Sequence, residues 1–99
     1  MHPPVSPGEI LLEEFMKPFG LSANALALAL RVPATRIGDI IRPEKPRGIS
    51  ADTALRLARY FGTSPEFWLN LQSAYDLARE IDEHGVTIER DVQPREAAA

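Results

Sequence analysis

The chain has 99 residues, of which 44% are hydrophobic and 25% charged, and this composition is typical of one globular domain rather than of a disordered or fibrous chain. It has no cysteine, no apolar run near the ~20 residues of a membrane span and no export signal at its start, so we expect a cytoplasmic protein without disulfides or thiolate metal sites. Its net charge of −3 argues against a nucleic-acid partner when the chain is taken as a whole.

The charge is distributed unevenly along the chain. Residues 21–47 carry five basic side chains and two acidic ones, a local charge of +3. Residues 80–99 carry six acidic side chains and two basic ones, a local charge of −4. The acidity of the whole chain is therefore an average over a basic middle and an acidic end, and the basic middle is a candidate for binding nucleic acid.

Apolar residues recur at helical spacing through most of the chain, and the alternation typical of strands is not sustained before Val86, so the sequence predicts an all-α domain. The first helix begins at Ser6, where the residues SPGE form a capping box with proline at the first helical position. We expect it to end before Pro18 and Gly20, because neither residue favours the interior of a helix.

Two short helices follow the first one. Ser22 is the expected N-cap of the earlier helix, whose apolar stripe consists of Leu26, Ala27 and Leu30. Pro33 starts the later helix, whose inward face consists of Ile37, Ile40 and Ile41. The next residues, 42–48, read RPEKPRG and are expected to form an exposed basic loop.

The second half of the chain predicts two more helices. The fourth runs from Ser50 to about Phe61, ends at Gly62, and has a core face of Ala54, Leu55, Ala58 and Phe61. The fifth opens with Ser64-Pro65-Glu66 and is expected to run to Glu83, with an apolar stripe of Phe67, Leu71, Ala74, Tyr75 and Ala78. Residues 1–84 are thus expected to form the domain, and residues 85–99 an acidic, disordered tail in which Val86 to Arg90 could form a short strand.

The second and third helices are joined by only about three residues, which forces them to cross steeply, as in a helix-turn-helix. In that arrangement the third helix presents its outer residues to the major groove, and Arg36 could make a bidentate contact to guanine. The expected base-reading residues are Ala34, Thr35, Arg36 and Asp39, and the expected phosphate-binding residues are Ser22, Asn24, Arg31, Arg42, Lys45 and Arg47. The same spacing also occurs in helical proteins that do not bind DNA.

Two segments carry a resemblance to a known family: SPGEILLEEFMKPFGLSANALALALRVPATRIGDIIR and GISADTALRLARYFGTSPEFWLNLQSAYDL. They resemble the HigA-type antitoxins of bacterial toxin–antitoxin modules, within the Xre or lambda-repressor-like group. The resemblance covers roughly residues 6 to 83, and its second half is the more specific part. It implies a five-helix homodimer that binds operator DNA, represses its own operon and silences a small RelE-like toxin that cleaves messenger RNA.

The chain departs from the family pattern at two positions. Arg31 stands in the turn where the family commonly has glycine, so a residue with a side chain must adopt the backbone conformation of that turn. Gly38 stands in the recognition helix where a polar residue is usual, which removes a possible base contact and costs about 1 kcal/mol of helix stability relative to alanine.

Little in the sequence supports an enzyme, a metal site or a cofactor. The only histidines are His2 and His84, and the adjacent Glu13 and Glu14 cannot converge on one metal from a helix face. The aromatic-rich start of the fifth helix favours the core, or alternatively a dimer interface made by Phe67, Trp68, Leu71 and Tyr75.

The sequence therefore favours an antitoxin and autorepressor whose partners are operator DNA, a toxin and a second copy of the chain. Two alternatives remain open. The first is a freestanding Xre-type transcription regulator without a toxin. The second is a helical adaptor for protein interactions in which the helix-turn-helix is only scaffold.

Overall fold

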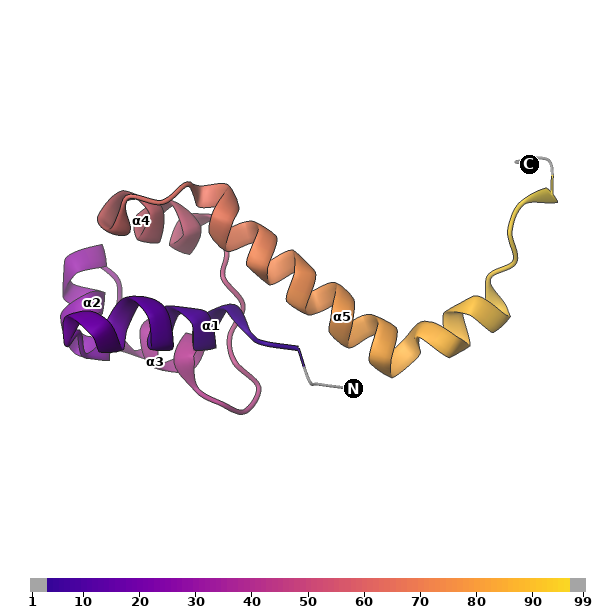
Figure 1. The fold of residues 1–99 in the computed structure, drawn as a ribbon, viewed down its shortest axis with the longest axis horizontal. Helices are drawn as coiled ribbons and strands as arrows, with labels where there is room; N and C mark the ends of the chain where they lie inside the picture. Colours follow the sequence, from indigo (N-terminus) through magenta and orange to yellow (C-terminus); the bar gives the residue numbers. More distant parts are fainter. Residues whose placement is uncertain (1–3, 97–99) are drawn as a thin grey trace.

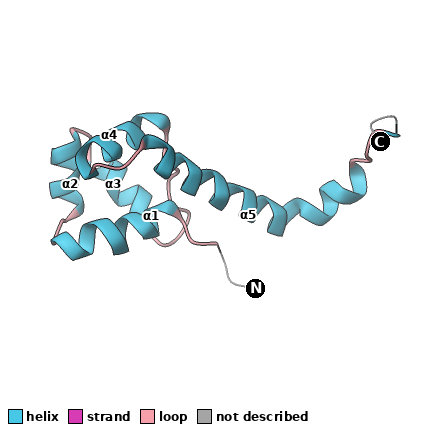
Figure 2. Cartoon of the chain, turned by 45° about the horizontal axis from the view of Figure 1, so that its top comes forward, coloured by secondary structure: helices cyan, strands magenta, loops and turns pink. Residues whose placement is uncertain are grey.

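The computed structural model describes residues 4–96. Within this range the chain forms helices and no strand, which confirms the all-α prediction (Figure 2). In chain order the elements are α1 (Pro7–Ile10), the π-helical η1 (Leu11–Met16), the 3-10 helical η2 (Lys17–Phe19), α2 (Ala23–Leu30), α3 (Ala34–Ile41), α4 (Ala51–Phe61) and α5 (Pro65–Asp91). Helices α1 to α4 gather at one end of the molecule, and α5 leaves them as a long extension (Figure 1). No described helix has the length and apolar character needed to cross a bilayer.

Serine side chains cap the predicted helix starts. In each case the hydroxyl oxygen accepts a hydrogen bond from a backbone N–H in the first turn, which satisfies one of the donors that a helix leaves unpaired there. The donor and acceptor atoms are 3.0–3.3 Å apart, and the capping residues are Ser6, Ser22, Ser50 and Ser64. These four predicted starts are confirmed.

The first helical segment extends past Pro18 but ends before Gly20. It continues through a π-helical turn to Met16 and a 3-10 turn to Phe19, so the expected end is confirmed at Gly20 and wrong at Pro18. Pro18 fits because it lies in the first turn of η2, where a missing N–H removes no hydrogen bond of that turn. Gly20 then ends the segment with a left-handed backbone, φ 65°.

The core lies between the four short helices and the first turns of α5. Trp68 is fully buried at its centre, and its indole Nε1–H donates to Thr63 Oγ1 at 2.8 Å. Phe15 packs against it with ring centroids 4.9 Å apart, and Phe61 meets Phe15 edge to face at 5.1 Å. The core therefore brings the first helical segment against the start of α5. The other buried apolar side chains are Leu11, Met16, Leu26, Ala27, Leu30, Ile37, Ile40, Ile49, Ala54, Leu57 and Ala58.

The predicted inner faces of the last two helices need correction. Leu55 was placed in the core but is 60% exposed, because the buried stripe of α4 lies further round the helix and includes Leu57 and Thr53. In α5 the residue that enters the core is Trp68, whereas Phe67 is 37% exposed and Ala74 lies at the surface. Both errors amount to a rotation of the apolar stripe by about one residue.

The fifth helix does not stop at Glu83. It continues through Gly85 to Asp91, so the strand expected at Val86 to Arg90 is wrong, and the expected tail is helical over its first residues. A strand there would lack a neighbouring strand to bond with, whereas a helix satisfies its own backbone groups. The helix carries the chain away from the bundle, and the radius of gyration is 16.7 Å against about 13 Å for a compact domain of this length.

Gly8 makes a close contact between α1 and α3. A Cβ atom built on Gly8 would lie 1.8 Å from the carbonyl oxygen of Ile40 and 2.7 Å from its carbonyl carbon, and both are backbone atoms that cannot move without α3. Only glycine therefore allows the two helices to approach this closely.

We predict that Gly8→Ala lowers the free energy of unfolding by about 1–3 kcal/mol, since α1 and α3 must separate. Gly38→Ala is the matched control, because nothing lies within 4 Å of that Cβ position in the middle of α3. It should raise stability by roughly 0.5–1 kcal/mol through helix propensity. Urea unfolding followed by circular dichroism measures both, and an unchanged midpoint for Gly8→Ala would contradict the packing described.

Candidate nucleic-acid interface

Helices α2 and α3 form a helix-turn-helix whose turn is closed by backbone hydrogen bonds. The N–H of Val32 donates to Ala27 O at 3.0 Å and that of Arg31 donates to Leu28 O at 3.2 Å, which is the Schellman pattern of a helix C-terminus. This pattern requires a left-handed residue, and Arg31 supplies it with φ 61°. The sequence-based expectation that a non-glycine residue must occupy this conformation is confirmed.

The recognition helix α3 buries one face and exposes the other. Ile37 and Ile40 are fully buried, whereas Ala34 and Thr35 in the first turn are exposed. Thr35 can therefore offer a hydroxyl and a methyl group to a base edge, and Ala34 an apolar contact. Of the four residues predicted to read bases, these two stand at an unobstructed surface.

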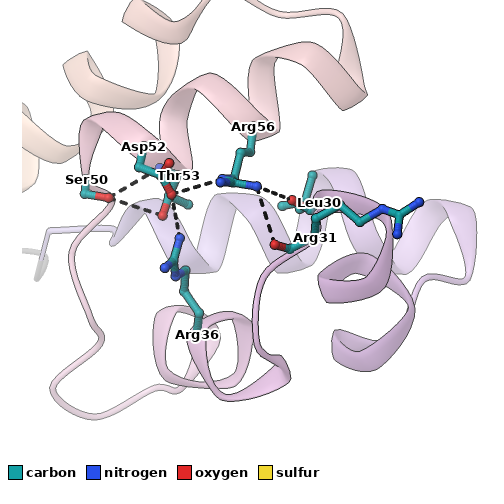
Figure 3. Close-up of polar contacts among 7 residues, drawn as sticks. All are labelled: Leu30, Arg31, Arg36, Ser50, Asp52, Thr53 and Arg56. Carbon is teal, nitrogen blue, oxygen red and sulfur yellow. Dashed lines mark hydrogen bonds and ion pairs between the residues drawn. The ribbon is translucent and has the colours of Figure 1, made fainter.

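Arg36 does not share the exposed surface of Ala34 and Thr35. Its guanidinium Nη1 donates to Asp52 Oδ2 at 2.7 Å, and only 25% of its side chain is exposed. Figure 3 shows the side chain reaching from α3 towards the first turn of α4. The predicted contact of Arg36 with guanine is therefore not available in this conformation, and the residue belongs to an ion-pair network inside the chain.

The same carboxylate holds a second arginine. Arg56 Nε donates to Asp52 Oδ2 at 3.0 Å, and Arg56 Nη1 donates to the carbonyl oxygens of Leu30 at 2.8 Å and Arg31 at 3.4 Å (Figure 3). The two arginines lower the pKa of Asp52 by hydrogen bonding to its charged form, with Arg56 making the larger contribution. Sequence reasoning missed Asp52 and Arg56 as part of the site, since their partners lie 16 to 26 positions away along the chain.

Asp39, the fourth predicted base reader, is also paired. Its carboxylate accepts from Arg42 Nη1 at 3.3 Å, and its carbonyl oxygen accepts from the backbone N–H of Arg47 at 2.9 Å. Arg42 Nε donates in addition to Lys45 O at 2.9 Å. Arg42 and Asp39 thus fold the basic loop against the end of α3, which sets the position of the remaining cations.

Three of the residues predicted to bind phosphate are cations that stay available at the surface. Arg31, Lys45 and Arg47 are exposed and form no ion pair within residues 4–96. Ser22 and Asn24 lie exposed at the start of α2, where Ser22 Oγ already accepts from the N–H of Ala25. The basic loop is anchored on its far side by the N–H of Ile49, which donates to Gln72 Oε1 at 2.8 Å.

The residues predicted for a dimer interface lie in different environments. Trp68 is fully buried within one copy of the chain, so it cannot contact a second copy and that part of the prediction is wrong. Phe67 is 37% exposed, Leu71 and Tyr75 are half-buried, and the Arg79 guanidinium lies 5.6 Å from the centre of the Tyr75 ring. For these three the interface stays a prediction.

An apolar surface further along α5 was missed. Leu77, Ile81 and Ile88 are 62%, 62% and 50% exposed, on the part of the helix that has left the bundle. Their spacing of four and seven residues continues the helical pattern and was visible in the sequence, but Gly85 and the alternation of residues 86–90 suggested that the helix had ended.

Glu80, Glu83 and His84 offer ligand atoms within 4.8 Å of one another on the exposed surface of α5. Glu80 Oε2 lies 3.1 Å from His84 Nδ1, and Glu83 accepts from Arg79 Nη2 at 3.1 Å. Pairs four residues apart are ordinary features of a solvated helix, and we assign no metal to them.

Comparison with known proteins agrees with this geometry. A family model described as helix-turn-helix matches residues 12–68. Virulence-associated protein I of Dichelobacter nodosus is 56% identical over 87 residues, which are 87% of this chain and 79% of that protein. Antitoxin HigA-1 of Vibrio cholerae is 42% identical over 74 residues, which are 75% of this chain and 68% of that protein.

A solved structure extends the likeness to three dimensions. The Pseudomonas aeruginosa antitoxin HigA, solved with the higBA promoter, superposes with a TM-score of 0.87 at 52% identity and covers 92% of this chain and 97% of its own. The family match includes the helix-turn-helix and the first residues of α5. The chain therefore belongs to the HigA-type antitoxins of the Xre-like helix-turn-helix family.

Proposed function

We propose that the protein binds operator DNA as a homodimer, represses its own operon and neutralises a RelE-like toxin that cleaves messenger RNA. The observation that carries the proposal is the exposed first turn of α3, with Arg31 in the turn before the helix and Lys45 and Arg47 in the loop after it, all three without an ion pair among the described residues. This surface offers base-reading groups between phosphate-binding groups, the arrangement that a major groove requires. The likeness to an antitoxin solved with promoter DNA supports it.

The contacts divide into two classes. Thr35 and Ala34 read base edges, because they are exposed at the N-terminal end of the recognition helix. The phosphate contacts position the protein and come from the start of α2, the turn before α3 and the loop after it: Ser22, Asn24, Arg31, Lys45 and Arg47. Arg42 and Asp39 act indirectly, since they hold the basic loop in place.

The homodimer is supported by the exposed apolar face of α5. A row of large apolar side chains on a helix that projects into solvent marks an interaction surface. A second copy carries the same row, so a twofold pairing of α5 helices covers both faces at once. A palindromic operator requires two recognition helices on one side of a duplex, about 34 Å apart, and a twofold dimer provides two copies of α3 for its half-sites.

The toxin partner rests on membership of the antitoxin family. A freestanding regulator would share the DNA-binding surface and the dimer, so neither feature separates these two functions. Toxin binding must therefore be tested directly, with the product of the neighbouring reading frame as the candidate toxin.

We predict different losses for the two classes of DNA contact. Thr35→Ala should reduce the ratio of operator affinity to random-sequence affinity by roughly tenfold, because it removes a base contact. Lys45→Ala should weaken binding to both DNAs equally and lower the slope of log K against log salt by about 0.9. Fluorescence anisotropy over a salt series measures both quantities.

Arg59→Ala is the control for lost positive charge, because Arg59 is an exposed cation in the last turn of α4 and should leave the slope unchanged. Equal loss of preference in Thr35→Ala and Lys45→Ala would reject the division of roles. Failure of the wild type to shift its own promoter at low salt would favour the adaptor instead.

For the dimer we predict that Ile81→Glu produces monomers at micromolar concentration, since it places a charge in the apolar face of α5. Leu28→Glu is the control: Leu28 is 76% exposed on α2, outside that face, and its variant should remain dimeric. Sedimentation equilibrium reports the mass of each. A dimeric Ile81→Glu variant would show that α5 does not form the interface.

For the toxin we predict that the product of the adjacent small reading frame co-purifies with the protein and stops growth when expressed alone. Co-expression with the protein should restore growth. A freestanding regulator would neither co-purify with that product nor rescue the cells.

A further inference from the structure

Asp52 links two helices that are far apart in the sequence. It lies in the first turn of α4, where the helix dipole and the Ser50 cap favour a negative charge. Its Oδ2 accepts from Arg36 at 2.7 Å on the recognition helix and from Arg56 at 3.0 Å one turn further along α4. The Asp52 side chain is 53% exposed, so solvent weakens each ion pair, but the shared oxygen sets where the two guanidinium groups lie relative to each other.

Arg56 connects that point to the turn of the helix-turn-helix. Its Nη1 donates to Leu30 O at 2.8 Å and to Arg31 O at 3.4 Å, the carbonyls at the end of α2. These carbonyls have no partner within their own helix, and the positive charge suits the negative end of the dipole. One chain of contacts therefore runs from the end of α2 through Arg56 and Asp52 to Arg36 on α3 (Figure 3).

The recognition helix has little to stabilise it by itself. It is eight residues long, its N-cap Pro33 makes no side-chain hydrogen bond, and Gly38 stands in its middle. Short helices with an interior glycine are marginal in water, so their orientation depends on outside contacts. Ile37 and Ile40 fix the buried face, and the Arg36–Asp52 pair is the polar contact that fixes rotation at the N-terminal end.

Arg36 also emerges from α3 in a different direction from the exposed residues. Successive helical residues are about 100° apart, so its side chain leaves the helix about 100° from Thr35 and about 200° from Ala34. That direction faces α4, in agreement with its limited exposure of 25%. To reach a base edge, Arg36 would have to abandon Asp52 and turn round the helix.

We propose that Asp52 is a positioning residue for operator recognition, and that Arg36 stays on Asp52 when DNA is bound. The pair holds the first turn of α3 at the angle at which Thr35 and Ala34 meet the bases. Arg36 then contributes to operator affinity without touching DNA. This inference rests on the proposed operator binding.

The test compares Arg36→Met, Asp52→Asn and the double variant with the wild type, in binding to the protein's own promoter DNA across a salt series. Each single variant should lose roughly tenfold in operator affinity, and the double variant should lose no more than either, because both remove the same contact. The slope of log K against log salt should stay unchanged, since no group that contacts phosphate is lost. Circular dichroism confirms that each variant retains its helices.

A matched control separates positioning from helix capping. Glu66 is the first-turn acidic residue of α5 and, like Asp52, it follows the first residue after a capping serine. Glu66→Gln should leave operator affinity unchanged. If it lowers operator affinity as much as Asp52→Asn does, then loss of charge or of helix stability explains both variants, and the proposal is overturned.

Two further outcomes would overturn the proposal while leaving the function intact. If Asp52→Asn binds the operator as tightly as the wild type or more tightly, the carboxylate does not position α3. If Arg36→Met lowers the salt slope by about 0.9, Arg36 contacts the DNA itself. A wild type that fails to bind its promoter would instead refute the proposed function.

Discussion

The recognition helix α3 has only eight residues, which is too short for a helix to be stable alone in water, so the rest of the domain is arranged to hold it. Ile37 and Ile40 anchor it in the core, and Gly8 lets α1 approach its backbone closely. The left-handed Arg31 sets the angle at which it leaves α2, and Asp52 ties its first turn to α4. A helix held on several sides can present small side chains such as Thr35 in a defined direction, and base reading depends on that direction.

The chain divides into two parts with different physical requirements. Residues 7–61 and the first turns of α5 bury a continuous core that includes Trp68. The remainder of α5 exposes Leu77, Ile81 and Ile88, and it carries most of the acidic end of the chain. The positive charge thus lies beside the recognition helix while the negative charge lies on the extension, so the net charge of −3 describes neither surface. With this distribution we expect only moderate nonspecific attraction to DNA, so the proposed operator binding depends on shape and on the proposed second copy.

The sequence predicted what is decided locally. The four serine caps, the turn glycines and the left-handed Arg31 depend on neighbours within about four residues, and the structure bears them out. The sequence-based predictions were wrong where contacts between residues far apart in the chain determine burial or the direction of a side chain. Leu55 faces solvent and Trp68 enters the core because of how α4 and α5 pack, and Arg36 turns to a carboxylate 16 positions away. The continuation of α5 was missed because Gly85 resembles a helix stop and residues 86–90 alternate as in a strand.

In the proposed dimer, a twofold pair of these domains reads two half-sites through α3. Hydroxyl-radical footprinting of the wild-type protein on its own promoter shows where this pair contacts the duplex. Protection on one face of the duplex at two half-sites, with centres about 34 Å apart or a multiple of that distance, is the result expected from a dimer with one recognition helix in each major groove. A single protected half-site, or uniform protection without regard to sequence, would show that two recognition helices do not read the promoter together.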